Sequence, residues 1–441
     1  MKKKENGQIL VILAIAMVAI LSITALAIDG SMVYNDRRTD QSTADSAALA
    51  GAGAAAQILK DHHPTDFVCG GGAAKPLANQ ATLAALQAAY DSALADDVTL
   101  TLQDTSAENY VHITCNPGLT GKKFLDVEVV VTSTVETTFA RVISRDTLTT
   151  KVKSIARVYP KQPFANGNAL VSLSNSCGSN VGGIEFAGSS DVDVTDAGIF
   201  SNSCIKAQSS ATSVIVIGGN IQYVSTCTGC DSADMEPDAT QASEPLPKDI
   251  LNADDIPNCP SDEDLYEDAN YSSGVLEPGN YFGLSIPANK TVTLKPGLYC
   301  LKGDLKNGSK SVFKAERVTF SILEGDVTIN QNDAGQAWLT APDCETKDAT
   351  CDVPPAVRGL LMYLDPAKPH KVTLNGGSTN LFEGTIYGPN TTFKINGGSA
   401  TDTFKAQIIG SYIYVSGSSM LQMNLNGAEM YWDDSSIDLI E

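Results

Sequence analysis

The sequence predicts a mainly β protein with one N-terminal helix, and three observations support this fold class. An uncharged apolar run occupies residues 9–28, alternating β-branched runs accompany one helical pattern within 61–160, and short strand patterns recur with a period of about 20 residues within 161–436. We therefore expect a transmembrane and stalk α-helix, a small α+β domain, and a C-terminal right-handed parallel β-helix, also called a solenoid. A chain of 441 residues has room for all three parts.

The apolar run is long enough to cross a bilayer. Its 20 residues, at about 1.5 Å of rise each, extend roughly 30 Å as a helix. A lysine cluster at 2–4 precedes the run and Asp29 follows it. The positive-inside rule therefore predicts a cytoplasmic tip at 1–8 and a single crossing of the cell membrane at 9–28, with the body outside the cytoplasm or at the cell surface.

The end of the apolar run leaves an alternative open. Ala25-Leu26-Ala27 resembles a signal-peptidase site, so the run could be a cleaved secretory signal. We favour a retained anchor, because the run is longer than the apolar part of most signals and its helical character continues. The proline-free, Ala-rich residues 29–60 predict a stalk helix.

Residues 61–160 combine one helix with several strands. Apolar residues at helical spacing predict a helix over 76–94, and Pro76 suits its first turn. Alternating runs rich in β-branched residues predict an antiparallel sheet from strands at 98–102, 111–114, 124–131 and 148–158.

Residues 161–436 repeat whole blocks of sequence, which favours a solenoid. The motif VTLNGGS at 372–378 recurs as FKINGGS at 393–399, and PGNY at 278–281 recurs as PGLY at 296–299. In a parallel β-helix each coil lies on the one before, inward apolar residues stack, and Asn side chains form ladders between coils. A β-sandwich of irregular hairpins is the alternative, because strand, Asn-Gly and strand is also a hairpin pattern.

A second class of strands alternates with the first. It comprises GLLMY at 359–363, GTIY at 384–387 and GSYIY at 410–414. Its tyrosines, Tyr363, Tyr387, Tyr412 and Tyr414, could form a ladder on one face. We favour core stacking of these rings over an exposed surface for carbohydrate or protein contact.

Charge is unevenly distributed along the chain. The sequence holds 30 Lys and Arg against 51 Asp and Glu, a net charge of −21, which argues against a nucleic-acid partner. Residues 231–268 are rich in acidic residues and proline, so we expect an exposed excursion from the solenoid there. Such carboxylates could hold a structural calcium ion, although no EF-hand spacing is present; we expect no other cofactor.

Ten cysteines all follow the apolar run, an arrangement typical of disulfides in an oxidising compartment. Neighbours in sequence suggest five pairs: Cys69 with Cys115, Cys177 with Cys204, Cys227 with Cys230, Cys259 with Cys300, and Cys344 with Cys351. The CxxC pair at 227–230 could instead be a redox site or half of a zinc site. No second CxxC or His pair follows at ligand spacing, so we favour a structural disulfide.

We find no catalytic, cofactor or metal site in the sequence and expect the protein not to be an enzyme. The nearest alternative is a polysaccharide-processing β-helix, which would need convergent carboxylates such as Asp191, Asp193 and Asp196. In DVDV, acids that alternate with valines are more simply the solvent side of a strand. His62 and His63 fit a polar turn better than a metal site.

The N-terminal residues carry a resemblance. Asn6-Gly7-Gln8, Ala27-Ile28-Asp29-Gly30, Tyr34, Arg37-Arg38, Gln41 and the Ala-rich stretch 44–52 together resemble the TadG-like N-terminal segment of Tad (Flp) pilus-assembly proteins. The processed pilins of the same systems have Glu five residues after the cleavage-site Gly, whereas Ile12 stands there after Gly7 in this chain. Residues 127–158 are also similar to the region that follows the anchor in TadG-like proteins.

The resemblance implies a membrane-anchored structural or interaction protein of a Tad-type pilus or a related surface assembly, either minor-pilin-like or an assembly or adhesion subunit. It implies other pilus or secretion-system subunits as partners, beside the bilayer and surface glycans. The residues expected to matter are the packing face of the assembly helix, Gly7, Gln8, Gly30 and Tyr34. The alternatives are the polysaccharide-processing enzyme and a glycan-binding adhesin.

Overall fold

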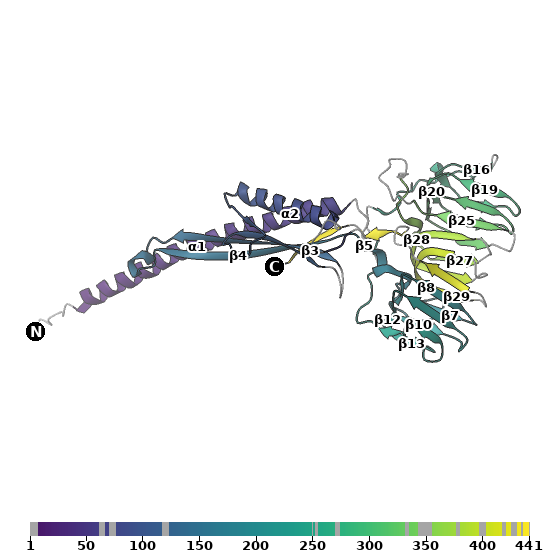
Figure 1. Ribbon diagram of the computed structural model, residues 1–441, viewed down its shortest axis with the longest axis horizontal. Coiled ribbons are helices and arrows are strands. Elements are labelled where there is room, and N and C mark those ends of the chain that lie inside the picture. The colour runs from purple at the N-terminus through teal and green to yellow at the C-terminus, as the bar shows by residue number, and fades with distance from the viewer. Residues whose placement is uncertain are drawn as a thin grey trace, which may run out of the picture. The chain divides into compact units, whose positions relative to one another are not determined.

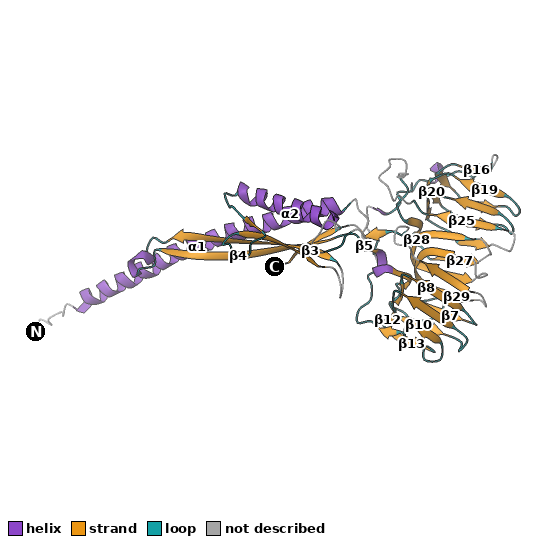
Figure 2. Ribbon diagram, viewed as in Figure 1, coloured by secondary structure: helices purple, strands orange, loops and turns teal. Residues whose placement is uncertain are grey.

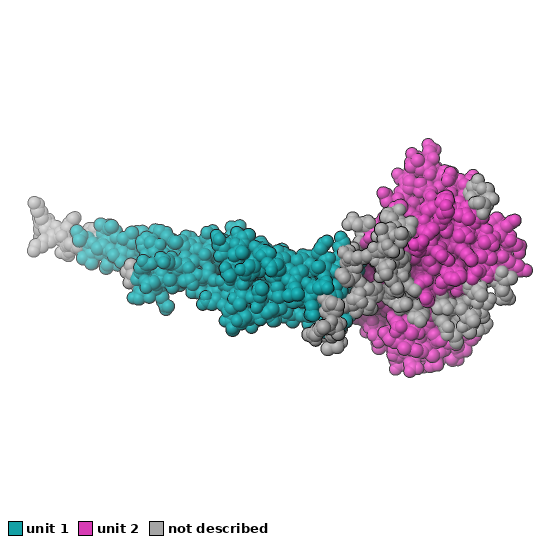
Figure 3. Space-filling model, turned by 45° about the horizontal axis from the view of Figure 1, so that its top comes forward, with its two compact units in different colours: residues 1–162, 434–441 teal, residues 163–433 magenta. Residues whose placement is uncertain are grey.

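The structure, a computed structural model, contains two compact units, coloured separately in Figure 3. Unit 1 comprises Met1–Gln162 and Asp434–Glu441, and unit 2 comprises Pro163–Asp433. The residues described are 8–60, 67–69, 76–116, 123–248, 250–251, 255–269, 274–330, 335–342, 355–375, 380–396, 403–416, 420–424, 430–433 and 435–440.

Helix α1 (Gln8–Leu59) is a single element of 52 residues. No proline interrupts it, and the Ala-rich sequence beyond residue 43 favours the helical state. Residues 10–28 are exposed except for Ala25, which is half-buried. Five alanines of one helix face are fully buried in unit 1: Ala44, Ala47, Ala48, Ala52 and Ala55. The helix predicted to continue past the apolar run is therefore confirmed.

Unit 1 packs α1 and a second helix, α2 (Pro76–Ala95), against one sheet (Figures 1 and 2). The sheet has the strand order β1-β2-β3-β4-β32. The strands are β1 (Thr101–Leu102), β2 (Tyr110–Asn116), β3 (Phe124–Glu136), β4 (Thr147–Tyr159) and β32 (Ser436–Ile440), and the short helix η2 (Ala140–Ile143) joins β3 to β4. The pairs β2–β3, β3–β4 and β4–β32 are antiparallel as predicted, whereas β1 pairs with β2 in parallel, so the first strand departs from the predicted antiparallel sheet.

Small residues allow the two helices to approach the sheet closely. A Cβ on Gly51 of α1 would lie 2.8 Å from the carbonyl oxygen of Ala85 and 3.0 Å from a methyl group of Val127. Both distances are too short for a side chain, so glycine permits the contact between α1, α2 and β3. Valines alternate toward this core along β3, as a half-buried strand requires.

The chain leaves unit 1 after β4 and returns to it for β32, so unit 2 is an insertion. We expected the solenoid to reach residue 436; in the structure unit 2 ends at Asp433, and β32 pairs with the edge of β4. The physical reason is that β3 pairs with only one edge of β4. The backbone of β32 pairs with the hydrogen-bonding groups of the other edge. Short strands β5 (Gln162–Pro163) and β31 (Trp432–Asp433) lie at the two boundaries in sequence.

Unit 2 is a β-solenoid of about nine turns with parallel pairing throughout. It has three faces, to which each turn contributes. Face A holds β16 (Val275–Leu276), β19 (Thr291–Leu294), β22 (Val312–Ala315), β25 (Gln336–Thr340), β30 (Met420–Asn424), β8 (Asp191–Thr195), β11 (Ser213–Ile217) and β14 (Asp234–Glu236).

Face B holds β17 (Gly279–Tyr281), β20 (Gly297–Leu301), β23 (Val318–Ile322), β26 (Leu360–Leu364), β6 (Asn168–Ser172), β9 (Gly198–Ser201), β12 (Ile221–Tyr223) and β15 (Thr240–Gln241). Face C holds β18 (Leu284–Ile286), β21 (Leu305–Asn307), β24 (Val327–Asn330), β27 (His370–Asn375), β7 (Gly183–Ala187), β10 (Cys204–Ala207) and β13 (Thr226–Thr228). The long strands β28 (Leu381–Asn396) and β29 (Thr403–Ser416) bend through all three faces, and η3 (Phe164–Gly167) precedes β6.

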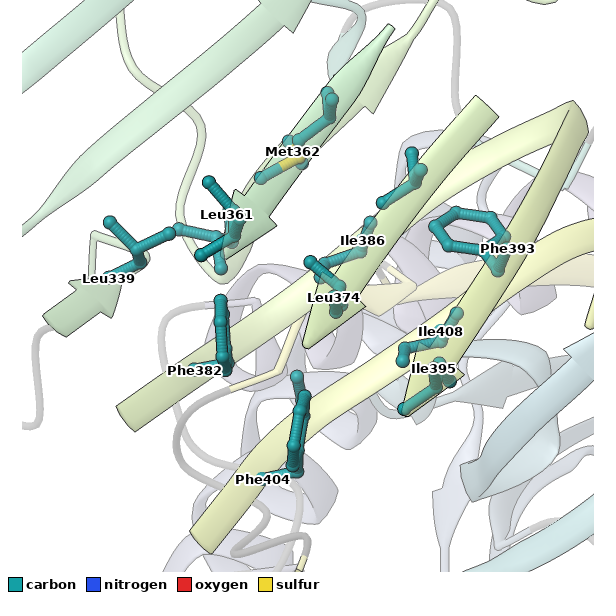
Figure 4. Close-up of a cluster of buried hydrophobic side chains, with 14 of the residues drawn as sticks. Leu339, Leu361, Met362, Leu374, Phe382, Ile386, Phe393, Ile395, Phe404 and Ile408 are labelled. Atoms are coloured by element: carbon teal, nitrogen blue, oxygen red, sulfur yellow. The ribbon is translucent and has the colours of Figure 1, made fainter. Parts of the chain in front are cut away.

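Inward side chains from successive turns form one continuous core. In Figure 4 apolar side chains of β25 to β29 point toward one another, among them Phe382 and Phe404, whose rings stack with centroids 4.9 Å apart. The predicted Asn ladder is present on face C: Asn330 pairs with Asn375, Asn375 with Asn396, and Ser416 donates to the Asn396 side chain at 2.7 Å. The motif at 372–378 thus lies on the motif at 393–399 over the described residues, in the predicted register.

The order of the turns differs from the predicted one. Each coil was expected to lie on the one before, but the chain begins in the middle of the stack. Its first turns run outward from β6 to β15, and later turns return from β16, so that β29 pairs with β6 and β7, and β30 with β8. We call this junction the seam; Figure 1 shows β29 beside β7 and β8. Sequence blocks reveal a period, but not which end of the stack a segment occupies.

A connection across face B makes this order feasible. We expected residues 231–268 to be an exposed excursion; in the structure their first part adds β14 and β15 to the ladder, and the rest belongs to a segment that crosses face B. We call residues 242–269 the strap, of which 249 and 252–254 are not described. Leu246, Ile250 and Leu251 of the strap pack on the outer side of face B, which explains why β6, β23 and β26 are buried on both sides.

Two sequence alignments of the solenoid need correction. The PGNY and PGLY blocks are offset by 18 residues, whereas the ladder pairs Gly279 with Tyr299, a shift of two that keeps each side chain on the same face. Tyr363 and Tyr387 stack on face B at 6.2 Å, but Gly410 pairs with Gly388, which moves Tyr412 and Tyr414 to face C. The predicted single tyrosine ladder is therefore two separate stacks.

The seam predicts a specific loss of stability. Gln407 of β29 is fully buried, and its Nε2 donates to the carbonyl oxygens of Phe164 at 2.9 Å and Asn168 at 2.7 Å. Gln407→Ala removes both bonds and leaves buried acceptors, so we expect the free energy of unfolding of the solenoid to fall by about 2–4 kcal/mol. Urea titration followed by circular dichroism measures it.

The matched control is Gln222→Ala in β12, where the side chain is half-buried and away from the seam. We expect it to change the same quantity by less than about 0.5 kcal/mol. If the two variants lowered the free energy of unfolding equally, closure of the seam would contribute no more to stability than an ordinary position of the solenoid.

Candidate functional site

The N-terminal part of α1 presents apolar side chains on all sides. Residues 10–24 are all exposed, and the helix is long and apolar enough to cross a membrane. A soluble helix would bury at least one such face, because exposed apolar area of this size is unfavourable in water. We call the apolar residues 10–28 the bare segment; it needs a surrounding apolar medium or an apolar partner.

The bare segment ends at a buried carboxylate. Asp29 is 3% exposed, and its oxygens accept backbone N–H bonds from Thr138 at 2.8 Å, Phe139 at 3.0 Å and Ala140 at 2.6 Å. These amides open η2 in the connection between β3 and β4. We call this arrangement the latch, and residues 137–146 the hairpin tip.

Two effects act on the pKa of Asp29. Burial raises it, and the three backbone hydrogen bonds favour the carboxylate and together lower the pKa below its ordinary value. The group is consequently ionised at neutral pH, where the latch is fully formed. As the folded pKa is lowered, the stabilisation is present above the ordinary value and is lost as pH falls through the folded one.

A second group of contacts continues the latch along α1. Asp40 accepts a hydrogen bond from Ser133 of β3 at 2.5 Å and from Thr150 of β4 at 2.9 Å. Asp36 also accepts from Ser133. Two carboxylates one helical turn apart thus share the hydroxyls of adjacent strands, which fixes the β3–β4 hairpin in register with the helix.

The residues predicted for the assembly helix lie on α1 where the structure describes them. Gly30 is exposed with open space around its Cα, and Tyr34, one turn further on, is 72% exposed. Gln8 begins the helix, and Gly7 lies outside the described residues. The structure leaves Gly30 and Tyr34 together on a surface that unit 1 does not cover.

The cysteines that the structure describes form four disulfides: Cys69 with Cys115, Cys177 with Cys204, Cys227 with Cys230, and Cys259 with Cys300. Their Cα atoms are 5.5–5.8 Å apart. The bond from Cys259 fixes the strap to β20 of face B, and the 41-residue separation favours a contribution of about 2–4 kcal/mol. Cys344 and Cys351 lie outside the described residues.

Unit 2 carries a groove of about 1090 Å³ at the corner between faces B and C. Turns of successive coils form its floor near Asp326, His370 and Asn390, and it also reaches the strap at Lys248 and the loop that follows β6 at Asn180. The lining mixes hydroxyl and amide side chains with charged and apolar ones, and prolines stand at the turns. The polar and charged side chains of this groove can hydrogen-bond an extended, hydroxyl-rich ligand.

The groove carries more positive than negative side chains, although the chain as a whole is acidic. Lys248, Lys371 and Lys394 are exposed in it, and none forms an ion pair within the described residues. Lys394 lies 6.0 Å from the ring centre of Tyr414. The carboxylate of Asp326 accepts the backbone N–H of Lys371 at 2.9 Å, so it supports the floor.

His370 of the groove lining contacts the backbone through both of its ring nitrogens. It is buried, with Nδ1 2.8 Å from the carbonyl oxygen of Gly325 and Nε2 3.1 Å from that of Asp365. Both ring nitrogens are therefore engaged by the backbone of neighbouring turns. His62 and His63, considered for a metal site, lie outside the described residues.

The candidate catalytic aspartates follow the strand pattern. Asp191 and Asp193 are half-buried on β8 and alternate with the fully buried Val192 and Val194. The outward neighbours of these two acids on β11 are Ser213 and Ile215. Asp196 lies beyond the strand in a turn with φ of 59°. The structure does not bring the three acids to a common point with a groove.

Sequence reasoning missed the latch and the groove. Asp29 is an isolated acid after an apolar run, and its partners follow more than 100 residues later. The sequence did mark the position of the hairpin tip, since Thr137 and Thr138 interrupt two alternating strands just before Phe139. The groove lysines belong to three separate segments, and no local motif connects them.

Comparison with known proteins assigns a family to one segment. Residues 7–56 match the family described as Putative Flp pilus-assembly TadE/G-like. This segment contains the bare apolar run, Asp29, Gly30 and Tyr34. No curated protein and no solved structure matches the chain.

The latch predicts a local change in backbone protection. Asp29→Ala removes the acceptor for three amides, so we expect hydrogen exchange at Thr138–Ala140 to become faster at pH 7. Because the pKa of Asp29 is lowered from 3.8, the difference between variant and parent should shrink only as pH falls below that value. Exchange measured by mass spectrometry at several pH values checks both statements.

Asp45→Ala is the control, since Asp45 lies on the same helix and accepts only from Gln41 of that helix at 2.8 Å among the contacts described. Exchange in the hairpin tip should stay at the parent rate. If Asp29→Ala left the three amides protected, the latch would not hold the tip.

Proposed function

We propose that the TadE/G-like segment makes this chain a membrane-anchored, minor-pilin-like subunit of a Tad-type (Flp) pilus or a related surface assembly, acting in assembly or adhesion. The family match and the apolar helix support a pilus-related membrane-anchored protein. The observation that carries the finer proposal is the continuity of α1: one helix is bare over 10–24 and buries one face in unit 1 from Ala44 onward. A subunit with such a helix can be held in a bilayer and pass its anchor to a neighbouring subunit.

We further propose that the N-terminus is cytoplasmic and that both units are outside the cytoplasm. The lysines at 2–4 and the acidic body support this orientation. Disulfides in both units agree with an oxidising compartment. Gly30 and Tyr34 are the proposed contact to another subunit, because both are exposed on α1 immediately after the latch.

A photo-crosslinking residue in place of Tyr34 tests this contact in native membranes. We expect crosslinks to pilus or secretion components or to a second copy of the chain. Leu83 of α2, which is exposed on a helix of the same unit, is the matched control position and should give none. Recovery of the protein in the soluble fraction, or equal crosslinking from both positions, would contradict the proposal.

The groove favours a second candidate function, adhesion to an anionic glycan. Three lysines without ion-pair partners among the described residues lie among hydroxyl and amide side chains that can bind sugar hydroxyls. We propose binding without turnover, because glycoside hydrolysis needs two convergent carboxyl groups. The described lining offers one, Asp326, which is already bonded to the backbone.

Charge reversal tests the glycan proposal. The double variant Lys371→Glu and Lys394→Glu should weaken binding to a polyuronate such as alginate at least about tenfold, with a smaller effect at high salt. The double variant Lys310→Glu and Lys314→Glu changes the same charge outside the groove lining and should bind as the parent does.

Incubation of the protein with the same polymer, with and without calcium, separates binding from turnover. New reducing ends or unsaturated products would support the enzyme alternative. Binding that both double variants weaken equally would mean that net charge, and not the groove, recognises the polymer.

A further inference from the structure

The hairpin tip overlaps the end of the bare apolar segment. Asp29 is the first residue after the uncharged run, and its carboxylate holds the amides of Thr138, Phe139 and Ala140. Ala25, inside the run, is half-buried although its neighbours are exposed. Four helical residues span about 6 Å, so the tip lies at the level of the last turn of the run.

This level corresponds to the interface of a bilayer that surrounds the run. The hydrocarbon core is about 30 Å thick, and the headgroup regions add roughly 5–8 Å on each side. A tip held at the last apolar turn therefore lies in the headgroup region and not in bulk water. Because the latch acts through backbone amides of the tip, the tip moves with the helix.

The chemistry of the tip suits that region. Phe139 is 42% exposed although its backbone is fixed, and an aromatic ring is a common interfacial anchor. Arg141 is exposed and lies 3.4 Å from Glu136 and 3.7 Å from Asp146. Arg145 is also exposed, and Glu136 and Asp146 balance the two arginines in number. The tip together with Glu136 therefore carries no net charge, so attraction to anionic lipid is not required.

We propose that the hairpin tip, through Phe139, is a second membrane contact of this protein, inserted into the headgroup region of the leaflet that faces unit 1. The inference rests on the proposed anchoring of α1 in a bilayer. The occupant is lipid and not a second copy of the chain, because the latch fixes the tip to the one helix that lipid surrounds at that level. Insertion of the tip would limit rotation and tilt of unit 1 against the membrane.

Fluorescence quenching in vesicles tests the proposal with the full chain. The parent contains Trp338 and Trp432, both in unit 2, so the signal of Phe139→Trp is taken as the difference from the parent. The protein is reconstituted in phosphatidylcholine with bromine on either the shallow or the deep part of the acyl chain. We expect shallow bromine to quench the added signal about twofold and deep bromine to quench it less.

Two variants make the result specific. Leu439→Trp places an equally exposed tryptophan, at a site 49% exposed, on β32 beside Ala156, toward the end of β4 away from the tip, and should not be quenched. Asp29→Ala in the Phe139→Trp background should lower the quenching toward that of Leu439→Trp. Addition of anionic phosphatidylglycerol should leave the quenching unchanged, since the tip together with Glu136 carries no net charge.

The outcomes separate this inference from the proposed function. If the protein floats with the vesicles but the added signal of Phe139→Trp is no more quenched than that of Leu439→Trp, the tip faces water or another copy and the inference is wrong. If the protein does not float with the vesicles, the anchoring proposal fails and the inference fails with it.

Discussion

The buried carboxylate of Asp29 is the interaction on which the arrangement of unit 1 depends. Asp29 is the first buried residue of α1 after the bare apolar run. Three backbone amides converge on it, so the β3–β4 hairpin must lie along the helix and end beside the last apolar turn. The contacts of Asp36 and Asp40 with Ser133 and Thr150 then set the register of the hairpin, and the rest of the sheet follows.

The solenoid depends on a different constraint, which is that every turn except the two at the ends of the stack has a neighbour on each side. The chain begins in the middle of the stack, so its first turn stays open until β29 and β30 arrive more than 200 residues later. This order of turns requires the strap as a connection, and the central strands of face B are buried on both sides because the strap covers them. Folding of unit 2 therefore requires a contact of long sequence separation, which slows the search for the native state.

The function proposed for the chain uses both units in different ways. The TadE/G-like segment supplies an anchor and an exposed surface at Gly30 and Tyr34, while the solenoid supplies a groove whose charge is opposite to that of the chain. The groove exists only because turns from the start, middle and end of unit 2 meet at the seam and the strap closes one side. Changes in the loops that connect the coils can therefore alter the groove lining without change to the stack.

The sequence by itself determined the elements whose pattern is local. Each of these elements has a pattern that residues close in sequence define, and the structure contains all of them. They are the apolar run, the Ala-rich continuation of α1, and the recurring strand that ends in Asn at 375 and 396. Only the tertiary structure decided which segments close on one another: Asp29 with the hairpin tip, β29 with β6, β32 with β4, and the strap with face B. These contacts join residues more than 100 positions apart or depend on an edge left unpaired, and hydrophobic periodicity carries no information about either. It predicts which side of an element is buried but not what covers it, because any apolar surface of matching shape satisfies the same pattern.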